Sequence, residues 1–161
     1  MRQVDRNFLD AIVMCNKEEV RQLLKAGANV DAKDEEHGKP AIMLAAEFGN
    51  KEIVELLISE GAKVDERDDQ GRTALFFADV GSEIFANLLT SGADINAVDH
   101  DGNTILMQHV SQSPSLAEVE ELLNLGIDPD VRNEYGESAL DLATGLGLVN
   151  VIERLKKQPA G

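Results

Sequence analysis

The chain has 161 residues, of which 43 % are hydrophobic, so it is long enough to bury one core and too apolar to be disordered. Its formal net charge of −15 repels nucleic-acid phosphate and anionic lipid, so we expect neither nucleic acid nor membrane among its partners. A single cysteine excludes an intrachain disulfide and a cysteine metal cluster. The charged first residues lack the apolar run of a signal peptide. We therefore expect a soluble, cytoplasmic protein.

The first element with a clear pattern is a helix that ends just before Gly27. Val20, Leu23 and Leu24 are spaced as i, i+3 and i+4, which places them on one apolar helix face. The glycine that follows suits the left-handed residue that closes a helix. Cys15 lies in or beside the preceding apolar helix, where we expect it to be a small buried apolar residue.

This pattern of helix and glycine returns three times along the chain. The closing glycines Gly27, Gly61, Gly92 and Gly126 are spaced 34, 31 and 34 residues apart. A second set, Gly38, Gly71, Gly102 and Gly136, is spaced 33, 31 and 34 residues apart. The matching apolar residues are Val54, Leu57 and Ile58, then Phe85, Leu88 and Leu89, then Val119, Leu122 and Leu123. Two independent markers with one period indicate a repeat protein.

A polar turn lies between the two glycines of each repeat, and a second helix follows it. An Asp or Asn at the first turn position and a Gly at the fourth, as in Asp68–Gly71, is typical of a type I turn. The hydroxyls of Thr73, Thr104 and Ser138 stand where a side chain caps a helix start, and Pro40 takes that place in the second repeat. Helices this short are stable only when neighbouring units stack.

The segment that opens this second helix occurs in four copies, Pro40–Met43, Thr73–Phe76, Thr104–Met107 and Ser138–Asp141. These copies resemble the corresponding segment of the ankyrin-repeat family. The family's Pro and His never occur together in them, so we expect weaker hydrogen bonding between turns. The family's remaining pattern is present in Leu44-Ala45-Ala46, Gly49-Asn50 and Gly61-Ala62. The resemblance covers nearly the whole chain, and it implies an all-α solenoid of stacked helix-turn-helix units with short β-hairpin-like turns.

We interpret residues 1–161 as a single ankyrin-repeat domain with five repeats, at about 6–34, 35–67, 68–98, 99–132 and 133–158. The first and last repeats are expected to be caps with a polar outer face. Lys156 and Lys157 follow the last apolar residues, and Pro159 is expected to stop the final helix. Both ends therefore predict a monomer.

Three repeats depart from the regular spacing. The third repeat is two residues short around Asp79–Ser82, between its helices. The fourth has a longer polar loop at Ser111–Ser115, and the second has one extra residue in its turn, at Asp34–His37. Loops tolerate such changes, although the longer turn lies on the side that the family uses for binding.

The spacing of the histidines and of Cys15 along the chain does not indicate a catalytic or metal-binding site. His37 and His100 fall on turns two repeats apart, and His109 lies inside a predicted helix. Neither they nor Cys15 have a partner at a recognisable nucleophile spacing, and Gly-rich phosphate loops are absent. We expect no enzyme activity, no metal and no cofactor. A small-molecule sensor or an enzyme would need a pocket with convergent polar groups, which the sequence does not indicate.

The turns carry most of the negative charge. Residues 31–38, 65–72, 94–103 and 128–137 hold fifteen acidic and four basic residues, a formal charge of −11 out of −15. The resemblance implies that these turns project side by side along a concave face, where they form an acidic strip. Two interpretations stay open: the strip attracts a basic partner, or it is a solvated edge of residues that favour turns.

The proposed contacts combine these turns with exposed aromatic residues. Phe48 stands outside the core stripe of its helix, and Tyr135 stands at a turn tip. Phe76 fits either the core or the binding face, whereas Phe77 and Met43 are assigned to the core. The positions that face the groove in the family add the remaining candidates. The complete set of predicted partner-binding residues is Phe48, Asp69, Arg72, His100, Asp101, Asn103, Glu134 and Tyr135.

The resemblance implies a non-catalytic protein-protein interaction module with a rigid concave, acidic face. The partner is expected to be a protein, with a basic one favoured by the charge. The alternative is an inhibitor or immunity-type protein that occludes a basic site on its target.

Overall fold

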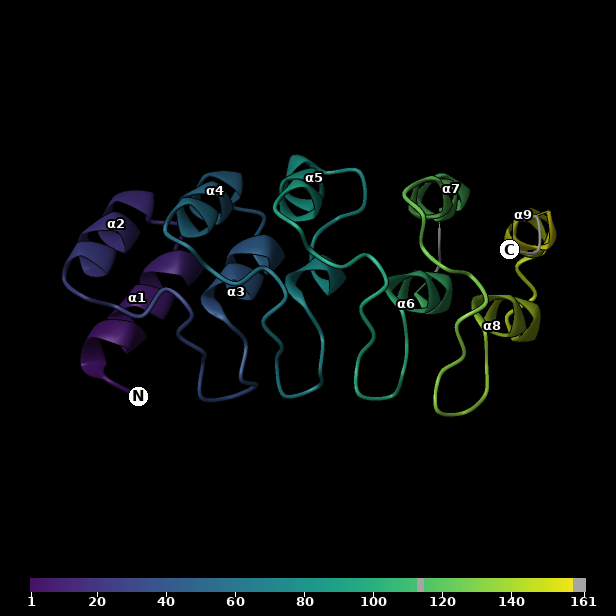
Figure 1. The fold of residues 1–161 in the computed structure, drawn as a ribbon, viewed down its shortest axis with the longest axis horizontal. Helices are drawn as coiled ribbons and strands as arrows, with labels where there is room; N and C mark the ends of the chain where they lie inside the picture. Colours follow the sequence, from purple (N-terminus) through teal and green to yellow (C-terminus); the bar gives the residue numbers. More distant parts are fainter. Residues whose placement is uncertain (113–114, 158–161) are drawn as a thin grey trace. The chain divides into compact units, whose positions relative to one another are not determined.

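The computed structural model describes residues 1–112 and 115–157 and contains two compact units, Met1–Asp94 and Ile95–Gly161. Both units consist of helices joined by tight loops and polar turns (Figure 1). Among the described residues, backbone pairing of the β type is limited to two isolated bridges, Lys33 with Pro40 and Val98 with Thr104. These bridges close the turns between the repeats, as the expected hairpin-like form requires. The prediction of an all-α fold is confirmed.

Unit 1 contains two layers of helices. The helices are α1 (Gln3–Val13), α2 (Lys17–Lys25), α3 (Ala41–Glu47), α4 (Lys51–Ser59) and α5 (Glu83–Thr90), with a 3₁₀ turn η1 (Ala74–Phe76). One layer runs through α1, α3 and η1, and the other through α2, α4 and α5. Each helix packs on its partner in the same repeat and on its counterpart in the next, so the core is continuous within the unit.

Unit 2 repeats this arrangement with two helix pairs. Its helices are α6 (Ile105–Ser111), α7 (Leu116–Asn124), α8 (Ala139–Gly145) and α9 (Val149–Lys156). Helix α6 packs on α7 and α8, and α9 packs on α7 and α8. Ile105, Leu106 and Val110 of α6 are fully buried, as are Val119 and Leu122 of α7. Small and branched apolar side chains thus form a core that contains no aromatic residue among the described residues of this unit.

The glycine that closes each second helix adopts the predicted left-handed conformation. Gly27, Gly61, Gly92 and Gly126 have φ between 86° and 94°. A side chain at these positions would be strained, and the glycine lets the chain leave the helix within one residue. The periodic glycines therefore set where each repeat ends.

The first helix of the third repeat is a single 3₁₀ turn, which the sequence did not predict. Ala74–Phe76 form η1 and Phe77 follows as its cap, whereas the equivalent segments form the seven-residue helices α3, α6 and α8. This repeat is two residues short around Asp79–Ser82, so less chain is available to complete a helix before α5 begins.

The cap predictions are confirmed at two positions and wrong at the third. Thr104 accepts a hydrogen bond from the backbone N–H of Met107 (3.3 Å), and Ser138 forms a reciprocal capping box with Asp141. Thr73 is buried, but its hydroxyl has no hydrogen-bond partner among the described residues. The 3₁₀ geometry of η1 explains the difference, because its backbone does not present an N–H to this side chain.

Cys15 is exposed, so the expectation of a buried apolar residue is wrong. It lies in the loop between α1 and α2 with φ of 55°, the left-handed region that side chains other than glycine rarely adopt. Gly49 and Gly147 occupy the equivalent loops with φ of 67° and 68°. Cys15 therefore takes the place of a glycine between two helices.

The aromatic residues divide between core and surface. Phe76 is buried with 6 % exposure and Met43 with 0 %, so the assignment of Met43 to the core is confirmed and Phe76 joins it. Phe77 is only half-buried, so its assignment to the core is wrong. The single turn of η1 ends at Phe76, and Phe77 then lies beside charged side chains.

The expected start of the first repeat and the expected end of the last helix can be compared with α1 and α9. Helix α1 begins at Gln3, three residues before the expected start of the first repeat. Lys156 and Lys157 are exposed at the end of α9, as expected. Ser113 and Pro114 of the long loop, residue 158 and Pro159 lie outside the described residues. The five repeat boundaries remain an interpretation. None of the helices described here is both long and apolar enough to cross a membrane.

Candidate functional site

In each polar turn, the side chain of the first Asp or Asn accepts hydrogen bonds from backbone N–H groups of the same turn. The carboxylate of Asp68 accepts hydrogen bonds from the backbone N–H groups of Gln70 and Arg72, both at 2.9 Å. Asp99 accepts in the same way from Asp101 and Asn103. Asp34 accepts hydrogen bonds from the backbone N–H groups of His37 and Lys39. Asn133 accepts them from those of Tyr135 and Glu137. An Asp or Asn at the start of a turn can satisfy these donors locally, which fixes the turn conformation.

A second set of side chains joins neighbouring repeats. Asp31 Oδ1 accepts from the backbone N–H of Lys63 at 2.9 Å in unit 1, and Asn96 Oδ1 accepts from that of Asp128 at 2.8 Å in unit 2. Asp65 accepts in the same way from the N–H of Asp94. These residues are the acid or Asn that stands four residues after the closing glycines Gly27, Gly61 and Gly92. The recurrence of that residue was visible in the sequence, but its bonding role was not predicted.

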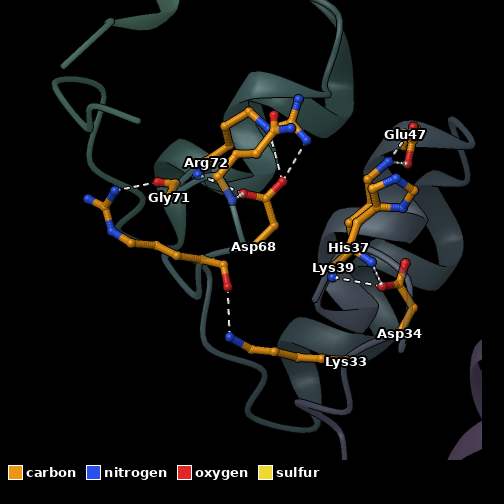
Figure 2. A network of polar contacts seen from close by, with 10 residues as sticks. Lys33, Asp34, His37, Lys39, Glu47, Asp68, Gly71 and Arg72 are labelled. Atoms are coloured by element: carbon orange, nitrogen blue, oxygen red, sulfur yellow. Dashed lines mark hydrogen bonds and ion pairs between the residues drawn. The ribbon is translucent and has the colours of Figure 1, made fainter. Parts of the chain in front are cut away.

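A network of polar contacts in unit 1 includes the two ion pairs Arg72–Asp68 and Lys39–Glu47 (Figure 2). Arg72 donates to Asp68 Oδ2 from Nε at 2.9 Å and from Nη2 at 2.7 Å, and Lys39 donates to both carboxylate oxygens of Glu47. The centre of the Phe77 ring lies 4.5 Å from Arg72 Cζ and 4.7 Å from Lys39 Nζ. Both cations are therefore held by a carboxylate and an aromatic face at once.

Asp68 is the most enclosed member of this network, with 0 % of its side chain exposed. Burial acts to raise its pKa, but the hydrogen bonds from the Arg72 guanidinium and from the backbone N–H groups of Arg72 and Gln70 together outweigh burial. The pKa of Asp68 therefore lies below its ordinary value. Asp68 is a charged structural residue of the turn and not a surface acid.

The three predicted residues of unit 1 have different environments. Phe48 caps the end of α3 and is 48 % exposed. Asp69 is exposed at its turn, where its backbone N–H donates to the carbonyl of His37 at 2.9 Å. Arg72 is held by Asp68, and its side chain is 23 % exposed. Of these three residues, only Phe48 and Asp69 are exposed with a side chain that makes no hydrogen bond or ion pair to the described residues.

The five predicted residues of unit 2 fall on two adjacent turns. The backbone N–H of Glu134 donates to the carbonyl of Asp101 at 2.8 Å, which joins the turns. Asn103 accepts from Asn133 Nδ2 at 3.0 Å and donates to Asp99 Oδ2 at 3.2 Å, so it bridges both turns and is partly buried. The other four, His100, Asp101, Glu134 and Tyr135, are exposed, Tyr135 by 72 %.

A groove of about 270 Å³ opens between these two turns and the helices α6 and α8. Asp99, Asn103, Tyr135 and Glu137 line it on the turn side. Helix residues complete the lining, namely Met107, Gln108, Ser111, Gln112 and Leu142, together with Asn133. The sequence predicted two of these residues, Asn103 and Tyr135, but not the groove itself.

The acidic turn residues separate into two classes. Most are engaged, either in turn or inter-repeat hydrogen bonds, or in ion pairs such as Glu35 with Arg6 and Glu66 with Lys33. Six exposed side chains make no hydrogen bond or ion pair to the described residues, and we call them the free turn carboxylates. They are Glu36 and Asp69 in unit 1, and Asp101, Asp130, Glu134 and Glu137 in unit 2.

The described residues offer no metal centre, because no three His, Cys, Asp or Glu side chains in that part of the chain are arranged to hold an ion. His109 Nδ1 lies 3.8 Å from a carboxylate oxygen of Glu118 on α7, which ties it to the neighbouring helix.

The repeats of both units match a known family. The family model for ankyrin repeats (3 copies) matches residues 9–99 and 78–160. The chain belongs to the ankyrin-repeat family. Its predicted identity as an ankyrin-repeat protein is thus confirmed.

A curated ankyrin-repeat relative is the mouse B-cell lymphoma 3 protein homolog, which is 33 % identical over 156 residues. The match covers 93 % of this chain and 35 % of the relative, so the chain spans about a third of that protein's length. The ankyrin repeats of this chain indicate a protein-protein interaction module, and proteins of this family are generally non-catalytic.

Proposed function

We propose that this chain is a non-catalytic binding module that engages a basic surface of a protein partner through its free turn carboxylates. The supporting observation is the division of the acidic turn residues. Turn formation accounts for Asp34, Asp68 and Asp99, because their carboxylates accept the N–H groups of their own turns. It does not account for the free turn carboxylates, which are exposed and make no such bond to the described residues.

Free carboxylates on a surface attract a basic partner over a distance. Charges already paired within the chain contribute little to the field outside it, whereas unpaired ones raise the association rate and orient the approach. The turns that carry them are held by internal hydrogen bonds, as in the turn organised by Asp99. A preformed turn loses little conformational entropy when it binds.

The test compares two variants that carry the same change in charge. The turn variant combines Asp69→Lys, Asp101→Lys and Glu134→Lys. The control variant combines Glu60→Lys, Glu121→Lys and Glu153→Lys, at exposed residues outside the turns. Each substitution adds two charges, so both variants change the formal net charge from −15 to −9.

Wild type and both variants are used to capture partners from the source cell, and association rates are then measured against salt. We expect one partner to bind wild type and control but not the turn variant. Its association rate with wild type should fall roughly tenfold or more as salt rises. Retention of the partner by the turn variant, or a rate independent of salt, contradicts the proposal.

The compartment and the oligomeric state belong to the same proposal. The free thiol of Cys15 is exposed, which suits a reducing compartment such as the cytoplasm. The charged residues Lys156 and Lys157 at the end of α9 favour a monomer.

A further inference from the structure

The residue after the second glycine of each repeat has a different charge in the two units. In unit 1 it is a cation, Lys39 or Arg72, and in unit 2 it is Asn103 or Glu137. In unit 1 these cations pair with carboxylates of the same unit, Lys39 with Glu47 and Arg72 with Asp68. The described lining of the unit 2 groove contains neither Lys nor Arg.

Arg72 shows how this environment holds a guanidinium. Two of its N–H groups donate to Asp68 Oδ2, and its Cζ lies over the ring of Phe77, 4.5 Å from the ring centre. Figure 2 shows the contacts of Arg72 with Asp68. A carboxylate at the start of the turn and an aromatic ring nearby are thus the two features that bind it.

The unit 2 groove contains both features without an internal cation. Asp99 is the counterpart of Asp68, since each stands three residues before its turn glycine and organises its turn with the same pair of N–H bonds. Its Oδ2 accepts a neutral amide from Asn103 at 3.2 Å, which leaves capacity for a second donor. Tyr135 provides the aromatic ring, and Glu137 adds a second carboxylate.

The floor of the groove suits the rest of a long basic side chain. Met107 and Leu142 line it, with Met107 only 2 % exposed. An arginine or lysine places its methylene stem on apolar surface and keeps its charged head at the polar rim. Here the rim consists of the carboxylates and the phenol ring on the turn side.

We infer that this groove of unit 2 binds an arginine side chain from an extended segment of the protein partner, an inference that rests on the proposed function. The guanidinium pairs with Asp99 and Glu137 and stacks on Tyr135, and its stem covers Met107 and Leu142. Arginine is favoured over lysine because a planar guanidinium can hydrogen-bond a carboxylate and stack on a ring at the same time.

The test needs only the labelled protein and short synthetic peptides. ¹⁵N-labelled protein is titrated with a blocked peptide that carries one arginine between alanines, while amide chemical shifts are recorded. Two matched peptides carry lysine or citrulline, the neutral analogue of arginine, in its place. We expect saturable shifts at Asn103, Tyr135 and Glu137 with arginine, and smaller ones with lysine. Citrulline should bind at least about tenfold more weakly, because it loses the charge-assisted hydrogen bonds.

Three variants test the residues of the groove. Glu137→Gln and Tyr135→Ala change exposed side chains that make no hydrogen bond to the described residues, and each should weaken arginine binding without lowering the thermal midpoint. Asn103→Arg should place an internal guanidinium on Asp99, as Arg72 lies on Asp68, and so block the peptide.

Three results overturn the inference. They are equal shifts with arginine and citrulline, shifts at Asp69 of unit 1 as large as those in the groove, and binding that survives both Glu137→Gln and Tyr135→Ala. These outcomes are distinct from failure of the proposed function, because the capture of a partner with the turn variant is measured separately. A partner that still requires the free turn carboxylates leaves that function intact.

Discussion

The substitution Asp68→Asn separates the turn role of this residue from its ion pair with Arg72. Asparagine at the equivalent position, Asn133, already accepts two turn N–H groups in unit 2, so the turn itself should persist. The amide nitrogen would then face the Arg72 guanidinium, donor against donor. The matched control is Asp99→Asn, where the partner is the neutral amide of Asn103.

The magnitude follows from burial and from the bonds that are lost. Asp68 is fully buried and takes two charge-assisted hydrogen bonds from Arg72, each of a class worth about 1.5–3 kcal/mol. Arg72 keeps 23 % of its side chain exposed, so water compensates part of the loss. We expect Asp68→Asn to lower the free energy of unfolding by about 2 kcal/mol, and Asp99→Asn by less than about 1 kcal/mol.

The assay is equilibrium urea unfolding followed by circular dichroism. Residue-resolved amide hydrogen exchange assigns each loss to its own unit. Because the pKa of Asp68 is lowered in the folded protein, its stabilisation is complete above the unfolded pKa of about 3.9. It is lost as the pH falls through the lower folded pKa, so wild type and Asp68→Asn should converge at acid pH. A cost no larger than that of Asp99→Asn at pH 7 would refute the importance of the ion pair.

Two further substitutions test local features of the backbone and of the caps. Cys15→Gly should raise the free energy of unfolding by about 0.5–1 kcal/mol, because φ of 55° strains any residue with a Cβ. Thermal or urea unfolding measures this gain, and the control Cys15→Ala should leave the free energy of unfolding unchanged. A gain from alanine equal to that from glycine would contradict the reasoning. Thr73→Val should be neutral or stabilise by up to about 1 kcal/mol, since it removes a buried hydroxyl without a partner among the described residues. Thr104→Val should instead cost about 1 kcal/mol because it removes the cap of α6, and equal effects at both threonines would show that the caps do not differ.

The sequence alone determined the repeat, its helices and their ends. These features depend on neighbours within one repeat: an apolar residue every third or fourth position, a glycine that can take positive φ, and an Asp or Asn that starts a turn. Such local preferences act wherever the segment lies, so the positions of Gly27, Gly61, Gly92 and Gly126 predicted the ends of α2, α4, α5 and α7. The exposure of Phe48 and Tyr135 followed from the place of Phe48 outside the apolar stripe of its helix and from the place of Tyr135 at a turn tip.

Only the tertiary structure decided which acidic residues are engaged and where the groove lies. Asp68 and Asp69 are adjacent acids in one turn, and composition alone cannot show that the first is buried against Arg72 while the second is exposed. In the shortened third repeat the first helix is the single turn η1, and the Phe77 ring that follows it lies beside the two cations Lys39 and Arg72. Each outcome depends on side chains that approach from other segments. The groove beside Tyr135 likewise requires two turns and two helices, which adjoin only when the repeats of unit 2 stack.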